Sequence, residues 1–373
     1  MGGETSSRRH VIPTLFCPLA LGALSLPNRI VMAPLTRARA GRDGVPGSLA
    51  ATYYAQRASA GLIISEATGI SREGLGWPHA PGLWSAAQVE GWKPVTDAVH
   101  TAGGRIVAQL WHMGRLVHPS VGGGQPVSAS ATTAPGMAHT YDGKQPYVEA
   151  RAVSLADIAR IIDDYATAAR NAIAAGFDGV QIHAANGYLI DQFLRGSANL
   201  RDDDYGGSID HRMRLALEVV KAVAAAAGMA RTGIRFSPNA PSQGVDDPDP
   251  EVLFVALAQR LRAVGLPWIE LREPVAGSTF GSNQTARVSP AMRRHYSGKI
   301  LLNSDFDGAR AKAALAEGVA DAISFGRPFI SNSDLVDRLR LGAPLAEADM
   351  ATWYSQGAQG YVDYPVIAEQ QAA

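Results

Sequence analysis

The sequence predicts an α/β fold, a single (β/α)8 TIM barrel with a long insertion after its third strand. Eight short runs rich in β-branched and aliphatic residues recur along the 373-residue chain. Helical patterns or loops separate these runs, and several runs are apolar on both faces, as parallel strands covered by helices are. Eight such alternations favour a closed barrel over an open doubly wound sheet.

The apolar runs define the expected strands. They cover residues 29–35, 62–67, 105–110, 179–183, 233–237, 268–271, 299–302 and 322–325. No linker and no internal sequence repeat separates them, so we expect one domain over residues 1–373.

Helical periodicity is clearest between Ser154 and Gly176, where apolar residues follow the three-four spacing of a buried stripe. Ser154 with Asp157 is a typical helix start, and Gly176 is a typical stop. Further helices are expected over residues 249–265, 307–318 and 333–341. The insertion, residues 111–153, is rich in Gly, Pro, Ser and Thr, and we expect it to form a lid or rim over a site.

Composition and charge exclude several classes of function. The 34 basic and 34 acidic side chains leave no net charge, whereas a nucleic-acid backbone calls for a basic surface. The single cysteine, Cys17, excludes an internal disulfide and a cysteine-based zinc site, and it fits a reducing compartment. No apolar run approaches the length of a membrane-spanning helix. We therefore expect a cytoplasmic protein, a monomer or homodimer, that binds small molecules and no metal, nucleic acid or membrane.

Polar side chains collect where the expected strands end, which is where barrels of this class build their sites. They are Thr36, Glu66 to Thr68, Gln109, His183 with Asn186, Arg235, Glu270 with Arg272, Asn303 with Ser304, and Gly326 with Arg327. Strand ends approach solvent, and this alone explains Ser and Thr there. It does not explain Gln109 and Arg235, because an amide and a charge inside apolar runs need partners.

The ends of strands seven and eight are where such barrels commonly hold a phosphate. Gly326-Arg327-Pro328 fits this use, because glycine allows close backbone approach and a guanidinium can clamp phosphate oxygens. Backbone N–H groups of Asn303 and Ser304 could contribute. Asp305 carries the wrong sign for an anion site, and Arg327 could equally pair with a carboxylate.

Ordered motifs along the chain resemble those of the Old Yellow Enzyme family of flavin-dependent ene-reductases. The match runs from about Leu15 to Pro365. Its blocks are Asn28 to Arg37 (NRIVMAPLTR), Ser65 to Thr68 (SEAT), Gln109 to His112 (QLWH), His183 to Phe193 (HAANGYLIDQF), Arg201 with Tyr205 to Ser208 (YGGS), Arg235 to Pro238 (RFSP) and Phe325 to Pro328 (FGRP). The His-x-x-Asn-Gly-Tyr block is the most specific of them.

The resemblance implies non-covalently bound FMN that NADPH or NADH reduces. The residues that would hold it are Pro34, Thr36, Ala67, Gln109, Arg235, Asn303, Ser304, Gly326 and Arg327. Thr36 would contact the flavin O4 and Gln109 would bond the pyrimidine edge. Arg235 would place its charge near N1 and O2, where negative charge gathers in the reduced flavin, and Arg327 would bind the phosphate.

The resemblance also implies the reduction of activated C=C bonds, in α,β-unsaturated carbonyl compounds and in nitro compounds or maleimides. His183 and Asn186 would both donate to one acceptor oxygen, which makes the β-carbon electrophilic. Tyr188 would protonate the α-carbon while flavin N5 gives hydride to the β-carbon. Trp77 and Tyr354 fall where relatives line the substrate pocket.

Two alternatives stay open from the residues alone. A barrel hydrolase would use Glu66 and Glu270, provided that the two carboxyls face each other across about 5–9.5 Å. That function leaves Gln109, His183 and Arg235 without roles. The other alternative is a flavin-binding barrel without alkene turnover.

Overall fold

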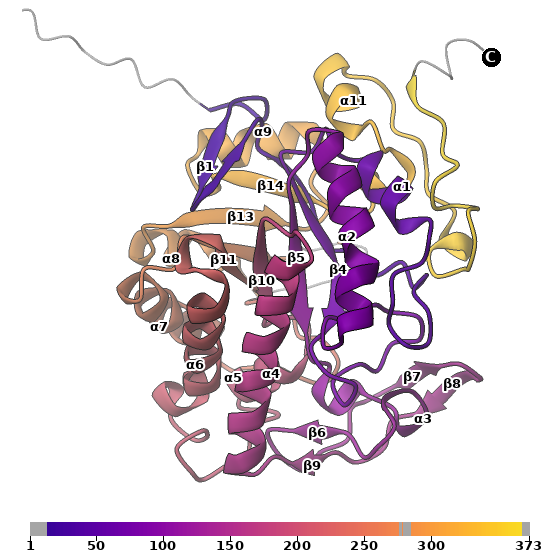
Figure 1. Cartoon of the computed structure of the whole chain (residues 1–373). Coiled ribbons are helices and arrows are strands. Elements are labelled where there is room, and N and C mark those ends of the chain that lie inside the picture. The colour runs from indigo at the N-terminus through magenta and orange to yellow at the C-terminus, as the bar shows by residue number, and fades with distance from the viewer. Residues whose placement is uncertain (1–12, 276–277, 279–284, 368–373) are drawn as a thin grey trace, which may run out of the picture.

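Eight parallel strands close into a barrel, as predicted, in the order β3-β4-β5-β10-β11-β12-β13-β14 (Figure 1). We describe residues 13–275, 278 and 285–367 of a computed structural model. The barrel strands are β3 (Ile30–Met32), β4 (Leu62–Gly69), β5 (Ile106–Trp111), β10 (Gly179–His183), β11 (Thr232–Phe236), β12 (Trp268–Arg272), β13 (Lys299–Asn303) and β14 (Ala322–Phe325). Two of them, β10 and β14, have the predicted bounds, and most others differ by one or two residues.

The first barrel strand is shorter than predicted. The apolar run suggested a strand over residues 29–35, but β3 ends at Met32. Ala33 still donates its backbone N–H to Phe325 O (2.9 Å). Pro34 follows and has no N–H to donate, so the ladder cannot continue and the chain leaves the barrel towards its open end.

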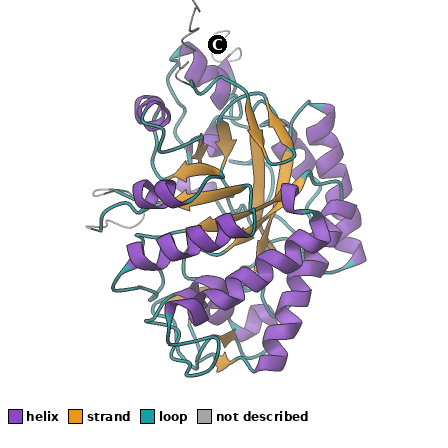
Figure 2. Cartoon of the chain, turned by 90° about the vertical axis from the view of Figure 1, so that its left-hand side faces the viewer, coloured by secondary structure: helices purple, strands orange, loops and turns teal. Residues whose placement is uncertain are grey.

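Helices cover the outside of the barrel, as Figure 2 shows. The helices of the described residues are α1 (Ala50–Ala55), α2 (Ala86–Thr101), α3 (Pro119–Gly122), α4 (Leu155–Ala174), α5 (Leu189–Leu194), α6 (Ile209–Ala227), α7 (Pro250–Ala263), α8 (Ser289–His295), α9 (Gly308–Ala316), α10 (Pro328–Ser331) and α11 (Leu335–Leu341), of which α3 belongs to the insertion. The predicted capping box is present at α4, where Ser154 and Asp157 each accept from the other's backbone N–H. Gly176, with φ +90°, ends the helical segment, as predicted.

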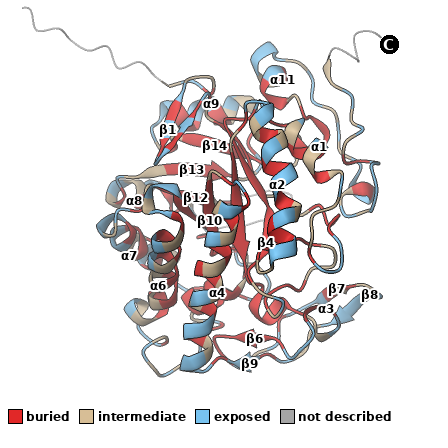
Figure 3. Ribbon diagram, viewed as in Figure 1, coloured by how far each residue is buried: buried red, intermediate tan, exposed pale blue. Residues whose placement is uncertain are grey.

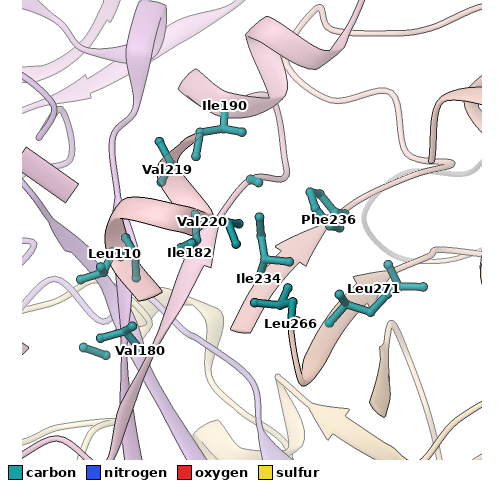
Figure 4. Packing of buried hydrophobic residues seen from close by; sticks show 14 of the residues in the cluster. Leu110, Val180, Ile182, Ile190, Val219, Val220, Ile234, Phe236, Leu266 and Leu271 are labelled. Atoms are coloured by element: carbon teal, nitrogen blue, oxygen red, sulfur yellow. The ribbon is translucent and has the colours of Figure 1, made fainter. Parts of the chain in front are cut away.

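Two apolar layers hold the barrel together, one inside the strands and one between strands and helices (Figure 3). The hairpin of β1 (Leu19–Leu21) and β2 (Leu24–Leu26) packs its leucines against inward-facing residues such as Val31 and Leu301. Figure 4 shows the outer layer, in which Ile182 and Ile234 belong to the same packed cluster as Val220 of α6. The hairpin closes one end of the barrel, so the site has to lie at the other.

The insertion contains the short helix α3 and four short strands. It contains β6 (Val127–Ser128) paired with β9 (Arg151–Ala152), and the hairpin of β7 (Met137–Thr140) and β8 (Gly143–Pro146). His139 of β7 packs on Trp77, with ring centroids 4.5 Å apart. Among the described helices, none combines the length and the apolar character that crossing a bilayer requires.

Candidate functional site

A cavity of about 920 Å³ lies at the carboxyl ends of the barrel strands, where the sequence placed the site. Its lining includes ten of the predicted site residues: Pro34, Thr36, Trp77, Tyr188, Arg235, Asn303, Ser304, Gly326, Arg327 and Tyr354. The other four predicted site residues, Ala67, Gln109, His183 and Asn186, are not part of this lining. His183 contacts Tyr188, and Asn186 contacts Arg272, which lines the cavity. Ala67 and Gln109 are register partners on β4 and β5.

The turn after β10 returns the chain towards the cavity, where Tyr188 is part of the lining. Asn186 (φ +60°) and Gly187 (φ +80°) both adopt left-handed backbone conformations, which asparagine and glycine tolerate best. The backbone N–H of Gly187 donates to Asp191 Oδ2 (2.9 Å). Asp191 is also paired with Arg195 (2.8 Å) in a fully buried salt bridge. This buried pair fixes the turn that carries Asn186 and Tyr188.

His183 is a neutral hydrogen-bond donor at this site. Burial lowers its pKa well below the ordinary value, and the nearby charges of Arg235 and Arg272 lower it further. The backbone N–H of Ala185 points to Nδ1 of the neutral ring (3.4 Å). An accepting Nδ1 places the ring proton on Nε2. His183 can therefore donate one hydrogen bond through Nε2 without carrying a charge.

Tyr188 packs edge-on against two rings. Its ring centroid lies 4.9 Å from that of His183 and 5.0 Å from that of Trp111. Burial raises the pKa of the Tyr188 hydroxyl, and a hydrogen bond from Gln243 opposes this only in part. Tyr188 therefore keeps its proton at neutral pH, at the wall of the cavity.

Arg272, at the end of β12, orients Asn186. Arg272 Nη1 donates to Asn186 Oδ1 (3.2 Å), which leaves the amide NH₂ of Asn186 to donate elsewhere. Burial and the charge of Arg235 lower the pKa of Arg272 to about 10, so it stays a cation. The sequence named Arg272 only as a polar strand end, and gave no signal for its contact with Asn186.

Arg235 is a buried cation on the cavity wall. It is 5% exposed, and Nη2 donates to Asn303 Oδ1 (2.8 Å). Nε lies 3.5 Å from Glu270 Oε2, a charge contact that lacks hydrogen-bond geometry. The Nε atom thus has no hydrogen-bond partner among the described residues. A buried cation of this kind fits a ligand whose edge becomes negative.

The cavity has two further arginines in its wall. Arg327 and Arg310 line it together with Gly326. A Cβ at Gly326 would meet only ordinary contacts, with Leu35 Cδ2 at 3.6 Å, so packing within the chain does not require glycine there. Asp305 carries a negative charge, which is unfavourable for binding a phosphate. Its carboxylate is paired with Arg327 and therefore lies at the expected phosphate site.

These features fit FMN. The volume suits a ligand of that size, and Arg235, Arg310 and Arg327 all line the cavity. The phosphate would have to share Arg327 with Asp305 or displace the Asp305 carboxylate from it. In the described part of the chain, no group of three or more His, Cys, Asp or Glu side chains is placed to hold a metal ion.

Glu66 and Glu270, the two carboxylates of the hydrolase alternative, accept hydrogen bonds from other groups of the protein. Glu66 Oε2 accepts from the backbone N–H groups of Arg37 (3.0 Å) and Ala38 (3.3 Å). Glu270 Oε2 accepts from Gln181 Nε2 (2.7 Å). Neither carboxylate lines the cavity. The geometry therefore gives no support to a pair of facing catalytic carboxylates.

Comparisons with known proteins show the family of the chain. Residues 14–346 match the model of the NADH:flavin oxidoreductase / NADH oxidase family. The chain is similar to chanoclavine-I aldehyde reductase of Penicillium roqueforti (strain FM164), with 44% identity over 370 residues that cover 96% of this chain and 98% of the relative. It is 40% identical over 377 residues to putative 12-oxophytodienoate reductase 12 of Oryza sativa subsp. japonica, covering 98% of this chain and 91% of the relative.

Two solved structures share the whole fold. The Old Yellow Enzyme homologue from Zymomonas mobilis superposes with a TM-score of 0.94 at 55% identity, covering 95% of this chain and 100% of the other. Morphinone reductase superposes with a TM-score of 0.92 at 46% identity, covering 96% and 98%. The chain belongs to the NADH:flavin oxidoreductase / NADH oxidase family, as one of the Old Yellow Enzymes.

Proposed function

We propose that His183, Asn186 and Tyr188 carry out the reduction of an activated C=C bond at this cavity. As an Old Yellow Enzyme, the chain is an FMN-dependent NAD(P)H oxidoreductase that reduces activated alkenes. One observation carries the residue roles. A neutral His183 packs against the protonated Tyr188 of the cavity wall, and Asn186 is oriented by Arg272, which lines the same cavity.

The cofactor, when bound, supplies the hydride chemistry, and the chain binds and tunes it. We assign its binding to Pro34, Thr36, Ala67, Gln109, Arg235, Asn303, Ser304, Gly326 and Arg327. Arg235 brings a buried positive charge to the ring, which favours the reduced, more negative state. Arg327 and Gly326 hold the phosphate, with Arg310 as a further cation at that end.

His183 and Asn186 act on the acceptor oxygen of the substrate. Nε2 of His183 and the amide nitrogen of Asn186 are both hydrogen-bond donors in the protonation states described above. Two donors directed at one oxygen stabilise the negative charge that develops there, and the gain is largest where water is excluded. The cations Arg235 and Arg272 strengthen this effect without donating a proton.

Tyr188 supplies the proton to the α-carbon. Its raised pKa matches the proton affinity of an enolate-like carbon better than a carboxylic acid would. Trp77 and Tyr354 line the same cavity and pack against each other, with ring centroids 5.2 Å apart, so they bound the space left for substrate.

The substrates are α,β-unsaturated carbonyl compounds, and nitro compounds and maleimides have the same acceptor chemistry. The names of two relatives, an aldehyde reductase and an oxophytodienoate reductase, both refer to carbonyl compounds. We also propose that residues 1–373 form one domain, cytoplasmic and monomeric or homodimeric, with no nucleic-acid partner. The balanced charge and the single cysteine support this part.

A visible spectrum tests the function. Purified protein is expected to carry the yellow absorbance of FMN, to be bleached by NADPH or NADH without oxygen, and to recover colour when 2-cyclohexenone is added. Protein that is reduced by the coenzyme but not reoxidised by any activated alkene would support a flavin-binding barrel without turnover.

A further inference from the structure

A chain of buried polar side chains runs through the barrel interior and joins the two residues assigned to the flavin's pyrimidine end. Gln109 Nε2 donates to Gln181 Oε1 (2.7 Å), and Gln181 Nε2 donates to Glu270 Oε2 (2.7 Å). Glu270 Oε2 lies 3.5 Å from Arg235 Nε. Gln181 and Glu270 are both 0% exposed, so they act only through other residues.

Strand register brings these four side chains together. Gln181 is the register partner of Gln109 on β5, and Glu270 is the register partner of Arg235 on β11. Gln181 and Glu270 lie on alternate strands, which point side chains into the same layer of a barrel. On the strand between them, the register partner of Gln181 is Gly233, and the Trp268 indole occupies the space that a side chain at Gly233 would need.

The Glu270 carboxylate fixes which group donates and which accepts in each of these hydrogen bonds. An ionised carboxylate only accepts hydrogen bonds, so Gln181 turns its NH₂ to Glu270 and its oxygen to Gln109. Gln109 must then turn its own NH₂ to Gln181. Its oxygen is left as an acceptor for another donor. The orientation of the Gln109 amide therefore depends on a charge two side chains away.

We propose that Glu270 is a positioning residue for the pyrimidine end of FMN. It fixes, through Gln181, which edge Gln109 presents, and it offsets the charge of Arg235. The inference rests on the proposed binding roles of Gln109 and Arg235. Two buried charges of opposite sign at this distance partly cancel at a third site. Glu270 therefore limits how strongly Arg235 favours the reduced cofactor.

Glu270→Gln tests the charge while keeping the side chain's size. The FMN midpoint potential, measured against a reference dye during slow anaerobic reduction, is expected to rise. The shift should be at least that of a tenfold gain in relative affinity for reduced FMN, about 30 mV for a two-electron couple. The matched control is Glu273→Gln, a buried carboxylate that accepts from the backbone of Val288 and Ser289. It should leave the potential unchanged.

Gln181→Met tests the orientation and keeps the Glu270–Arg235 contact. The readout is binding of FMN and of N3-methyl-FMN, followed by flavin fluorescence. Wild-type protein should bind the methylated analogue at least tenfold more weakly than FMN, because the Gln109 oxygen cannot accept from a methylated nitrogen. Gln181→Met should lose most of this discrimination, since Gln109 can then turn over.

The outcomes separate this inference from the function on which it rests. A wild-type protein that takes up no FMN overturns both. If the wild type binds FMN but Glu270→Gln has the same FMN midpoint potential as the wild type, the inference alone is overturned. The inference is also overturned if Gln181→Met discriminates between FMN and N3-methyl-FMN as strongly as the wild type does. If Glu270→Gln does not fold, the result for Gln181→Met decides the question.

Discussion

Arg272 Nη1 donates a hydrogen bond to Asn186 Oδ1 across 3.2 Å, joining the end of β12 to the turn after β10. The contact links residues 86 positions apart in the chain. It makes Asn186 a donor rather than an acceptor at the point where we propose that the acceptor oxygen of the substrate binds. Arg272 thus decides the chemistry that Asn186 can offer.

Replacing Arg272 should therefore weaken catalysis through Asn186. Arg272→Met removes the hydrogen bond, so we expect kcat/KM for 2-cyclohexenone to fall about tenfold, the worth of one hydrogen bond to a charged group. Anaerobic flavin reduction by NADPH should change far less. Arg272→Lys is the control, because it keeps a cation and a donor. An unchanged kcat/KM in Arg272→Met would contradict the orienting role.

Tyr188→Phe should separate the two halves of the reaction. Loss of a general acid typically slows proton transfer by about 10²–10⁴-fold. We expect that loss in flavin reoxidation by 2-cyclohexenone, measured by stopped flow, while NADPH still bleaches the flavin at the wild-type rate. Tyr188 would not be the proton donor if alkene turnover survived the substitution.

Two buried neutral histidines should make the free energy of unfolding depend on pH. Burial lowers the pKa of His112 to about 3 and lowers that of His183 well below its ordinary value. In the unfolded chain both would titrate near the usual value of about 6.5. Below that pH the unfolded chain binds more protons, so stability present above pH 6.5 is lost as the pH falls. At pH 5 His112 should cost about 2 kcal/mol, and His183 should change stability in the same direction.

His112→Gln tests this pH dependence. His112 Nδ1 accepts from the backbone N–H of Gly114 (3.0 Å), and a glutamine oxygen can replace that acceptor. The free energy of unfolding in urea, compared at pH 7 and pH 5, should differ less in His112→Gln than in the wild type, by about 2 kcal/mol. Identical differences in the two proteins would contradict a neutral buried His112.

Arg327 and Asp305 should have opposite effects on cofactor affinity. Arg327→Ala removes a charge-assisted phosphate contact, so FMN should bind about 10–100-fold more weakly. Asp305→Asn removes the carboxylate that pairs with Arg327 and should tighten FMN binding. Fluorescence titration of cofactor-stripped protein measures both. Weaker binding in Asp305→Asn would indicate that Asp305 positions Arg327 instead of competing with the phosphate.

Glu66→Gln should act on stability and not on chemistry. Glu66 is 5% exposed and accepts from two backbone N–H groups in the segment after β3. An amide side chain keeps one acceptor but loses the charge, so we expect a loss of about 1–3 kcal/mol in the free energy of unfolding. FMN uptake should persist once the protein is folded. A glycosidase activity that disappears in Glu66→Gln would revive the hydrolase alternative.

The amino-acid sequence by itself determined the features that local patterns encode. The strands β10 and β14 have the predicted bounds, because each is a short apolar run between breaking signals. The capping box at Ser154 and the left-handed turn at Asn186 and Gly187 also depend on neighbouring residues only. The ordered motifs then indicated the family and, through it, FMN.

Only the tertiary structure decided which distant polar groups meet. Gln181 and Glu270 are 89 residues apart, and their hydrogen bond depends on barrel closure and on the register of β10, β11 and β12. The sequence placed the negative charge of Asp305 beside the expected phosphate site, and only the fold shows that Asp305 is paired with Arg327. A side-chain hydrogen bond requires an approach of about 3 Å. Strand register sets such approaches across a closed sheet, and periodicity along one strand contains no information about its partners.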